Sequence, residues 1–352
     1  MVVALVPMDI ISFFLTDPEK VSYPQLAIGL LFHIPTVLKA IFFKFMKKKY
    51  ETLMCYLQYN TLISENGEVL EIFEKEKDAS QKFNKIYTLT ILFSVFGFTV
   101  PPVAIALYNI FGNSSGRLVT IELSFPVSLP YNMDTAKGYA LGAVHMFFQV
   151  HLIAFAFIGM DVLIAGLMRT TIAHLKCLAK QFSVIRNDVR SQTNGKAKDE
   201  FIKAIQYLQR IYKGHRDVEN LQYLMLFTQY ICSVAILAVG LYRNSKDFKV
   251  DAVLFKSCGF FIIVLFQPFL YCYFGDMVTR EAENVKTALY ESDWIGSRIG
   301  YQRLVLLTLT RLNRPLIFTC GKLIDLSNPA FVTIVNTSYS AFNLLKKSNE
   351  SF

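Results

Sequence analysis

Residues 139–168 read YALGAVHMFFQVHLIAFAFIGMDVLIAGLM, and Asp161 is the sole acidic or basic side chain among them apart from two histidines. An α-helix rises about 1.5 Å per residue, so about 20 apolar residues cross the hydrocarbon core of a bilayer, which is roughly 30 Å thick. The run is long enough for this, and it predicts a transmembrane helix.

The composition of the whole chain agrees with that prediction. Hydrophobic residues make up 53% of the 352 residues and charged residues 18%, with a mean hydropathy of +0.37; soluble domains carry about 25% charged residues. The net charge of +9 would suit a nucleic-acid-binding protein, but the Lys and Arg residues fall between the apolar runs, as they do at the flanks of membrane spans. We therefore expect the lipid bilayer, and no nucleic acid, as a partner.

Further apolar runs predict a helical bundle. With the run above, six full spans are expected, at about 24–43, 87–111, 139–168, 221–242, 252–276 and 326–345. A shorter run, MVVALVPMDIISFFL at 1–15, is too short to cross alone and is interpreted as the remaining half of a first span. The predicted fold is thus an all-α, seven-transmembrane helical bundle with a truncated first span, in a protein whose native start lies upstream.

The basic residues predict the orientation. Residues 44–85, 169–217 and 277–325 contain 8, 11 and 7 Lys plus Arg, whereas the alternate connections at 16–23, 113–137 and 243–251 contain 1, 2 and 3. Because cytoplasmic loops are the Lys/Arg-rich ones, the N-terminus is expected inside the cell and the C-terminus outside. This topology is inverted relative to G-protein-coupled receptors, in a multi-pass protein of the plasma membrane.

The segments expected in the cytoplasm carry helical patterns of their own. Apolar residues recur at helical spacing after the spans that end near 43 and 168, so we expect long helices to continue below the membrane. The polar stretch RNDVRSQTNGKAKDE, residues 186–200, predicts a mobile loop between two of them.

No pattern of catalytic or cofactor-binding residues is found in the sequence. It lacks a nucleotide-binding glycine loop, a His-Glu-x-x-His helix and a nucleophile elbow. Its six cysteines have neither CxxC nor zinc-site spacing. We expect no enzyme activity, no cofactor and no metal site; Asn113, in an Asn-Ser-Ser sequon, is a candidate for glycosylation.

Ionisable residues inside the spans are few. Lys39 and Asp161 lie toward the predicted cytoplasmic ends of their spans, so we expect their side chains to reach the membrane surface.

A ligand pocket is predicted in the outer halves of the spans. Pro101 and Pro102 interrupt the span at 87–111, and because proline removes a backbone donor, they are expected to kink it and open space. Aromatic and aliphatic groups with a few polar groups suit small apolar ligands, although the same residues also suit ordinary packing. The candidate residues are Leu30, Phe32, Phe98, Thr99, Val103, Met146, Phe147, Val150 and Phe260.

The C-terminal third resembles the insect odorant receptor family. The similarity lies in ALYESDWIGSR at 288–298 and in RLNRPLIFTCGKLIDLSNPAFVTIVNTSYSAFNLL at 311–345. Upstream, LPYNMDTAKGY at 129–139 is similar to the family's second outer loop. The related gustatory receptors would end in a Thr-Tyr and Gln-Phe pattern, which is absent.

The resemblance implies a tuning subunit of an odorant-gated, non-selective cation channel, acting as a tetramer with the odorant receptor co-receptor. It implies an odorant-binding bundle at 1–276, a cytoplasmic anchor segment at 277–325, and a pore-lining last span with a short outer tail at 326–352. Trp294, Arg314 and Pro315 match anchor positions. The ligand would be a small apolar volatile.

The last span also has a candidate gate. Val335, Ser338, Phe342 and Leu345 step by three or four residues and are predicted to share one helix face. Hydrophobic constrictions can close pores by dewetting, so Phe342 and Leu345 are the candidate gate. The alternative to a gate is a packed tail helix. The alternatives to an odorant-gated channel are a gustatory-type channel, a seven-span receptor coupled to G proteins, and a secondary transporter.

Overall fold

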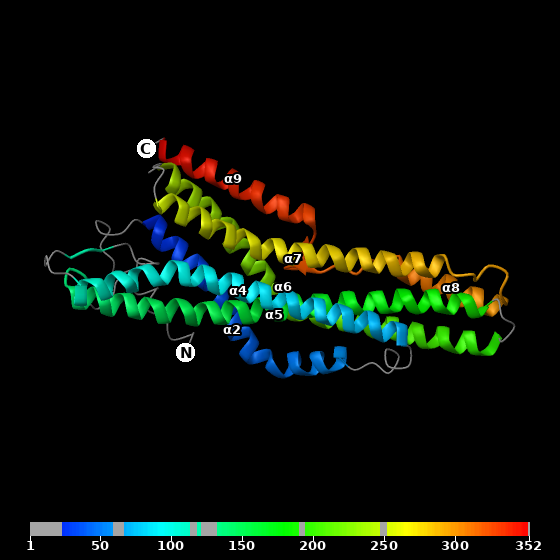
Figure 1. Ribbon diagram of the computed structural model, residues 1–352. Coiled ribbons are helices and arrows are strands. Elements are labelled where there is room, and N and C mark those ends of the chain that lie inside the picture. The colour runs from blue at the N-terminus through cyan, green and yellow to red at the C-terminus, as the bar shows by residue number, and fades with distance from the viewer. Residues whose placement is uncertain are drawn as a thin grey trace.

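The computed structural model describes residues 23–58, 67–112, 118–120, 132–189, 194–246 and 252–350, which form an elongated bundle of helices (Figure 1). The α-helices are α2 (Tyr23–Gln58), α4 (Gly67–Leu107), α5 (Ala136–Val189), α6 (Asn194–Lys246), α7 (Ala252–Tyr290), α8 (Ile299–Leu312) and α9 (Asn328–Glu350). A π-helical turn, η1 (Tyr108–Gly112), follows α4, and a hairpin of β1 (Thr319–Cys320) and β2 (Ile324–Asp325) precedes α9.

The predicted membrane spans are confirmed as helices. Each of the six full runs falls almost entirely on helix, with the run at 87–111 ending in η1 and the run at 326–345 beginning two residues before α9. Helices α2, α4, α5, α6 and α7 are long and apolar enough to cross a bilayer. With 23 residues α9 has the length to cross, but its composition is less apolar. The run at 1–15 and Asn113 lie outside the described residues.

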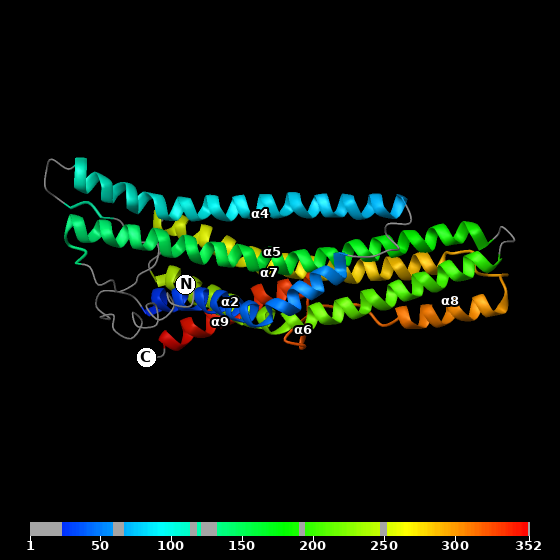
Figure 2. The same ribbon diagram turned by 90° about the horizontal axis from the view of Figure 1, so that it is seen from below.

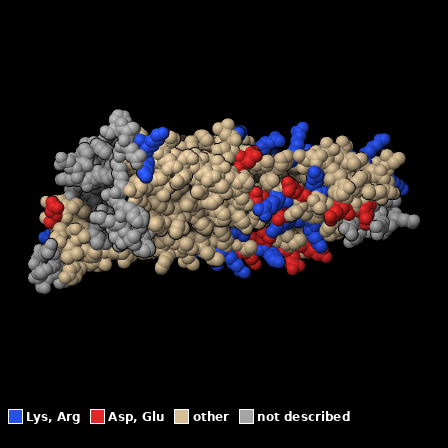
Figure 3. All heavy atoms as spheres, turned by 90° about the horizontal axis from the view of Figure 1, so that it is seen from above, with Lys and Arg blue, Asp and Glu red and all other residues tan. Residues whose placement is uncertain are grey.

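The long helices divide the molecule into an apolar part and a charged part. With 54 residues α5 is about 80 Å long, far more than the roughly 30 Å hydrocarbon core. Charged side chains gather over one half of the bundle and are nearly absent from a broad band beside it (Figure 3). The helices therefore continue well beyond the membrane, as the sequence predicted.

The loop predicted at 186–200 is wrong in extent. Helix α5 continues to Val189 and α6 begins at Asn194, so helix covers most of that stretch. Good helix formers such as Ala197 and Glu200 outweigh the polar composition that suggested a loop.

The helices pack around one main core. Helix α5 contacts α4, α6 and α7, while α2 and α9 pack against α6 (Figure 2). The core continues into the charged half, where the rings of Phe182, Phe201 and Tyr301 meet. Helix α4 bends near the end that contains Pro101 and Pro102, in agreement with the predicted kink.

A hairpin fixes the start of α9 to α6. Gly321 has a φ of +65°, a conformation that favours glycine, and its amide donates to the carbonyl of Tyr223 in α6 at 2.9 Å. Helix α7 runs unbroken through residue 276, so the predicted boundary between bundle and anchor falls within one continuous helix.

Candidate functional site

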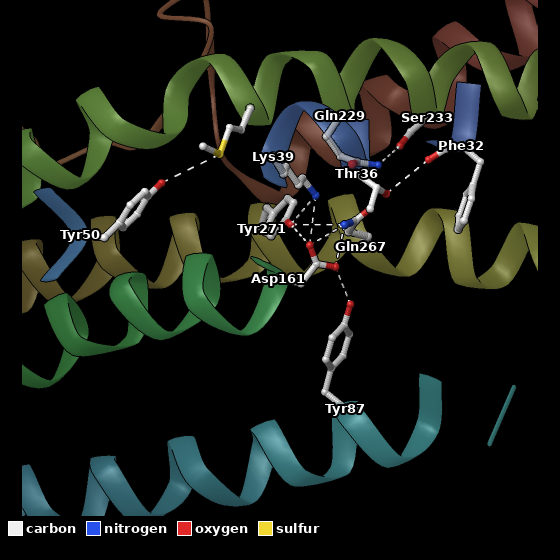
Figure 4. Close-up of polar contacts among 11 residues, drawn as sticks. Phe32, Thr36, Lys39, Tyr50, Tyr87, Asp161, Gln229, Ser233, Gln267 and Tyr271 are labelled. Carbon is white, nitrogen blue, oxygen red and sulfur yellow. Dashed lines mark hydrogen bonds and ion pairs between the residues drawn. The ribbon is translucent and has the colours of Figure 1, made fainter. Parts of the chain in front are cut away.

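A buried polar network joins four helices around Asp161 (Figure 4). Asp161 lies on α5, Lys39 on α2, Tyr87 on α4, and Gln267 and Tyr271 on α7. Gln267 and Tyr271 are four residues apart, so both side chains project from the same face of α7. We call these five residues the Asp161 network.

The carboxylate of Asp161 accepts hydrogen bonds from every other member. The Lys39 ammonium is 3.1 Å from Oδ1, the Tyr87 hydroxyl donates to Oδ2 at 2.6 Å, and the Gln267 amide donates at 2.6 Å. The Tyr271 hydroxyl donates to Oδ1 and in turn accepts from Lys39 at 3.2 Å. One carboxylate thus holds three neighbouring helices against α5.

Burial makes this network costly to disturb. The Lys39 and Asp161 side chains are 1% and 2% exposed, inside helices long and apolar enough to span a bilayer. Charges at such depth are expensive unless they are paired and hydrogen-bonded, so they mark functional candidates. The prediction that both side chains reach the membrane surface is wrong, because each finds its partner inside the bundle.

The sequence held a usable signal for this pair. Lys39 and Asp161 are opposite charges at similar depth in two apolar runs, and in hydrocarbon each stabilises the other. No local signal shows that the two helices place them on facing sides.

The predicted pocket residues fall into separate contacts rather than one ring. Phe32 of α2 meets Phe260 of α7 with ring centroids 5.5 Å apart, and stacks on Phe157 of α5 at 5.7 Å. Phe147 instead contacts Phe96 and the ring of His151, within α4 and α5. The structure therefore brings together Phe32 and Phe260, with Phe157 as a neighbour that the sequence prediction missed.

The other predicted pocket residues are placed as follows. Thr99 and Met146 are buried, and the Thr99 hydroxyl donates to the carbonyl of Val95 in its own helix. Val103 packs against a small cluster formed by Ala106, Tyr139 and Ala143. The half-buried residues are Leu30, Phe98 and Val150.

A small cavity lies between α6, α7, the hairpin and the start of α9. Its lining includes Gln229, Tyr271, Cys320, Ala330 and Ile334, and none of the nine predicted pocket residues. Tyr271 therefore belongs both to the Asp161 network and to the wall that faces the start of α9.

The predicted gate residues share one side of α9 by their helical spacing, but they differ in burial within this chain. Ser338 is 2% exposed, and its hydroxyl donates to the Ile334 carbonyl in the same helix at 2.7 Å. Val335 and Leu345 are exposed, and Phe342 is half-buried beside Tyr339. Within this chain Ser338 is therefore covered by neighbouring residues, while Val335 and Leu345 are not.

The residues at predicted anchor positions lie on the two sides of α8, with Trp294 before the helix and Arg314 and Pro315 after it. Trp294 packs on the main core, and its indole donates to the Tyr290 carbonyl at 3.2 Å. Arg314 and Pro315 are exposed, and the Arg314 carbonyl accepts from the Tyr212 hydroxyl of α6 at 3.1 Å.

Fold and network together define a multi-span, mainly helical membrane protein with a buried ion pair inside its bundle. A profile of the family described as 7tm Odorant receptor matches residues 27–339. The chain belongs to this family of insect odorant receptors, which are receptors rather than enzymes.

The chain is also similar in sequence to individual odorant receptors. The chain is 33% identical to odorant receptor 46a, isoform B, of Drosophila melanogaster over 165 residues, and 24% identical to odorant receptor 10 of Aedes albopictus over 181 residues. These matches cover 46% and 50% of this chain, and 43% and 47% of the relatives. The chain thus spans about half the length of the relatives it matches.

Solved structures share the fold. The insect olfactory receptor OR5 from Machilis hrabei superposes with a TM-score of 0.78 at 14% identity, over 98% of this chain and 86% of the receptor. The same receptor in complex with eugenol gives 0.78 at 15% identity, over 99% and 87%.

Proposed function

We propose that this chain is the tuning subunit of an odorant-gated, non-selective cation channel, assembled with the odorant receptor co-receptor in the plasma membrane. The N-terminus is cytoplasmic and the C-terminus extracellular. Its ligand is a small apolar volatile, held among the outer halves of the helices near Phe32 and Phe260. Eugenol, in the complex with OR5 from Machilis hrabei, is a compound of this kind.

The exposed face of α9 is the observation that carries the channel proposal. Asn336, Ser340 and Asn343 recur at helical spacing and are exposed on the chain. Amide groups facing hydrocarbon cost free energy, because lipid offers them no hydrogen bond. This face therefore suits water or another subunit, as the lining of a shared pore would.

The gate belongs on the same helix. Val335, Phe342 and Leu345 supply apolar groups on the other side of α9, about half a turn around the helix from Asn336, Ser340 and Asn343. Trp294 precedes α8, and Arg314 and Pro315 follow it. All three belong to the segment at 277–325, where an anchor between subunits would form, between the bundle at 1–276 and the pore helix at 326–352.

Electrical recording tests the proposal. The chain, with the co-receptor, is expressed in cells that lack other odorant receptors and is exposed to eugenol and a panel of volatile esters and alcohols. We expect cation currents that persist when G proteins are blocked, and Phe342→Ser should change the leak or the gating. Currents abolished by the blockers would instead favour a G-protein-coupled receptor.

A further inference from the structure

The Asp161 network touches the proposed odorant side of the bundle. Phe157 and Asp161 are four residues apart on α5, and so lie on one face. Phe157 stacks on Phe32, while the Lys39 ammonium lies 5.6 Å from the centroid of the Phe157 ring. A ligand that displaces Phe32 would therefore press on a ring that lies against the network.

The network also reaches the start of α9, by way of α7. Two residues after Gln267, Phe269 meets Phe331 of α9 edge to face, with ring centroids 5.4 Å apart. Further along α7, Asp276 accepts a hydrogen bond from Asn328 in the first turn of α9 at 2.9 Å. A shift of α7 relative to α5 would consequently move the contacts that hold the base of α9.

Stability alone is a weak reason for a buried ion pair in this place. Well-packed apolar side chains usually stabilise a core as much as a buried ion pair does. A carboxylate that holds four directed donors does something that apolar packing does not: it fixes how α2, α4 and α7 are rotated and offset against α5.

We propose that Asp161 is a positioning residue that couples the odorant side of the bundle to α9, with the contacts of its network setting the balance between closed and open channels. The inference rests on the proposed function and names the residues that regulate it. Any change that weakens the network biases the same equilibrium, so different members should act in the same direction.

Matched hydroxyl deletions test this coupling. Tyr87→Phe and Tyr271→Phe each remove one hydrogen bond to Asp161 and keep the ring, while Tyr50→Phe removes a buried hydroxyl whose contact is Met225 Sδ at 4.0 Å. Each variant is expressed with the co-receptor, counted at the cell surface by an epitope tag, and recorded for basal current and for the response to the most active compound of the panel.

We expect Tyr87→Phe and Tyr271→Phe to shift basal current per surface channel, or the half-maximal concentration, by about threefold or more in one common direction. Their effects should combine non-additively, because both act on one carboxylate, and Tyr50→Phe should leave both readouts unchanged. Shifts in opposite directions, no shift, or an equal shift in Tyr50→Phe would overturn the coupling. If the wild-type chain with the co-receptor gave neither basal nor evoked current, that result would instead contradict the proposed function.

Discussion

Gly275 of α7 lies against Leu326, the residue that leads from the hairpin toward α9. A Cβ at Gly275 would fall 2.6 Å from the Leu326 Cβ and 2.7 Å from its carbonyl oxygen. Glycine is therefore required here by close approach, at the point where α7 meets the base of the proposed pore helix.

Replacing this glycine should loosen that junction. We expect Gly275→Ala to lower the free energy of unfolding by about 1–3 kcal/mol, because the backbone near Leu326 must move. Gly166→Ala in α5 is the matched control, since a Cβ there meets nothing within 4 Å. Thermal unfolding in detergent measures both, and equal stability of the two variants would contradict the close approach.

Replacing one partner of the buried Lys39–Asp161 ion pair by a neutral residue should destabilise the fold more than replacing both. Lys39→Met or Asp161→Asn alone leaves one buried charge without its counter-charge, at a cost of about 3–5 kcal/mol. The double variant restores neutrality and should regain much of the lost stability. Fluorescence-detected size-exclusion chromatography after heating compares the stability of the two single variants and the double variant. A double variant whose loss of stability equals the sum of the two single losses would argue against the pairing.

The core of the charged half of the bundle should depend on Phe201. Its ring is fully buried between Phe182 and Tyr301, with centroid distances of 5.7 and 5.1 Å. Phe201→Ala is expected to cost about 3–5 kcal/mol through lost burial and a cavity. Phe93→Ala, at a side chain that is 83% exposed on α4, should cost far less in detergent; comparable melting temperatures for the two would refute this.

Cys320 should resist alkylation at neutral pH. Burial raises the pKa of its thiol to about 12. The thiolate is the reactive form, and a pKa of about 12 leaves Cys320 with ~1,000-fold less thiolate than an ordinary cysteine has at the same pH. Raising the pH toward 12 should ionise the thiol.

A cysteine introduced into the same hairpin serves as the reactive control for Cys320. Leu323→Cys, at a position 78% exposed in the same hairpin, should react quickly with iodoacetamide at pH 8, while Cys320 reacts only after denaturation. Peptide mass spectrometry reads both rates in one protein. Equal rates in the native state would show that the hairpin is not packed as described.

The spans could be predicted because length and hydropathy are local properties. Helical spacing also predicted the continuation of α5 and α6 below the membrane. By contrast, the position of Ser338 inside the chain depends on how α9 is rotated against α6, which spacing alone leaves open. The pairing of Lys39 with Asp161 joins residues 122 positions apart, and only the packed bundle determines it.

Bilayer thickness should have little influence on the fold itself. Helices α5, α6 and α7 continue without a break from the apolar band into the charged half of the bundle. Their backbone hydrogen bonds therefore stay within each helix wherever the membrane surface lies along it. A thicker or thinner membrane would change which side chains it covers, at a fraction of a kcal/mol per Å of mismatch. The chain can therefore settle deeper or shallower in membranes of different lipid content without exposing irregular backbone to lipid.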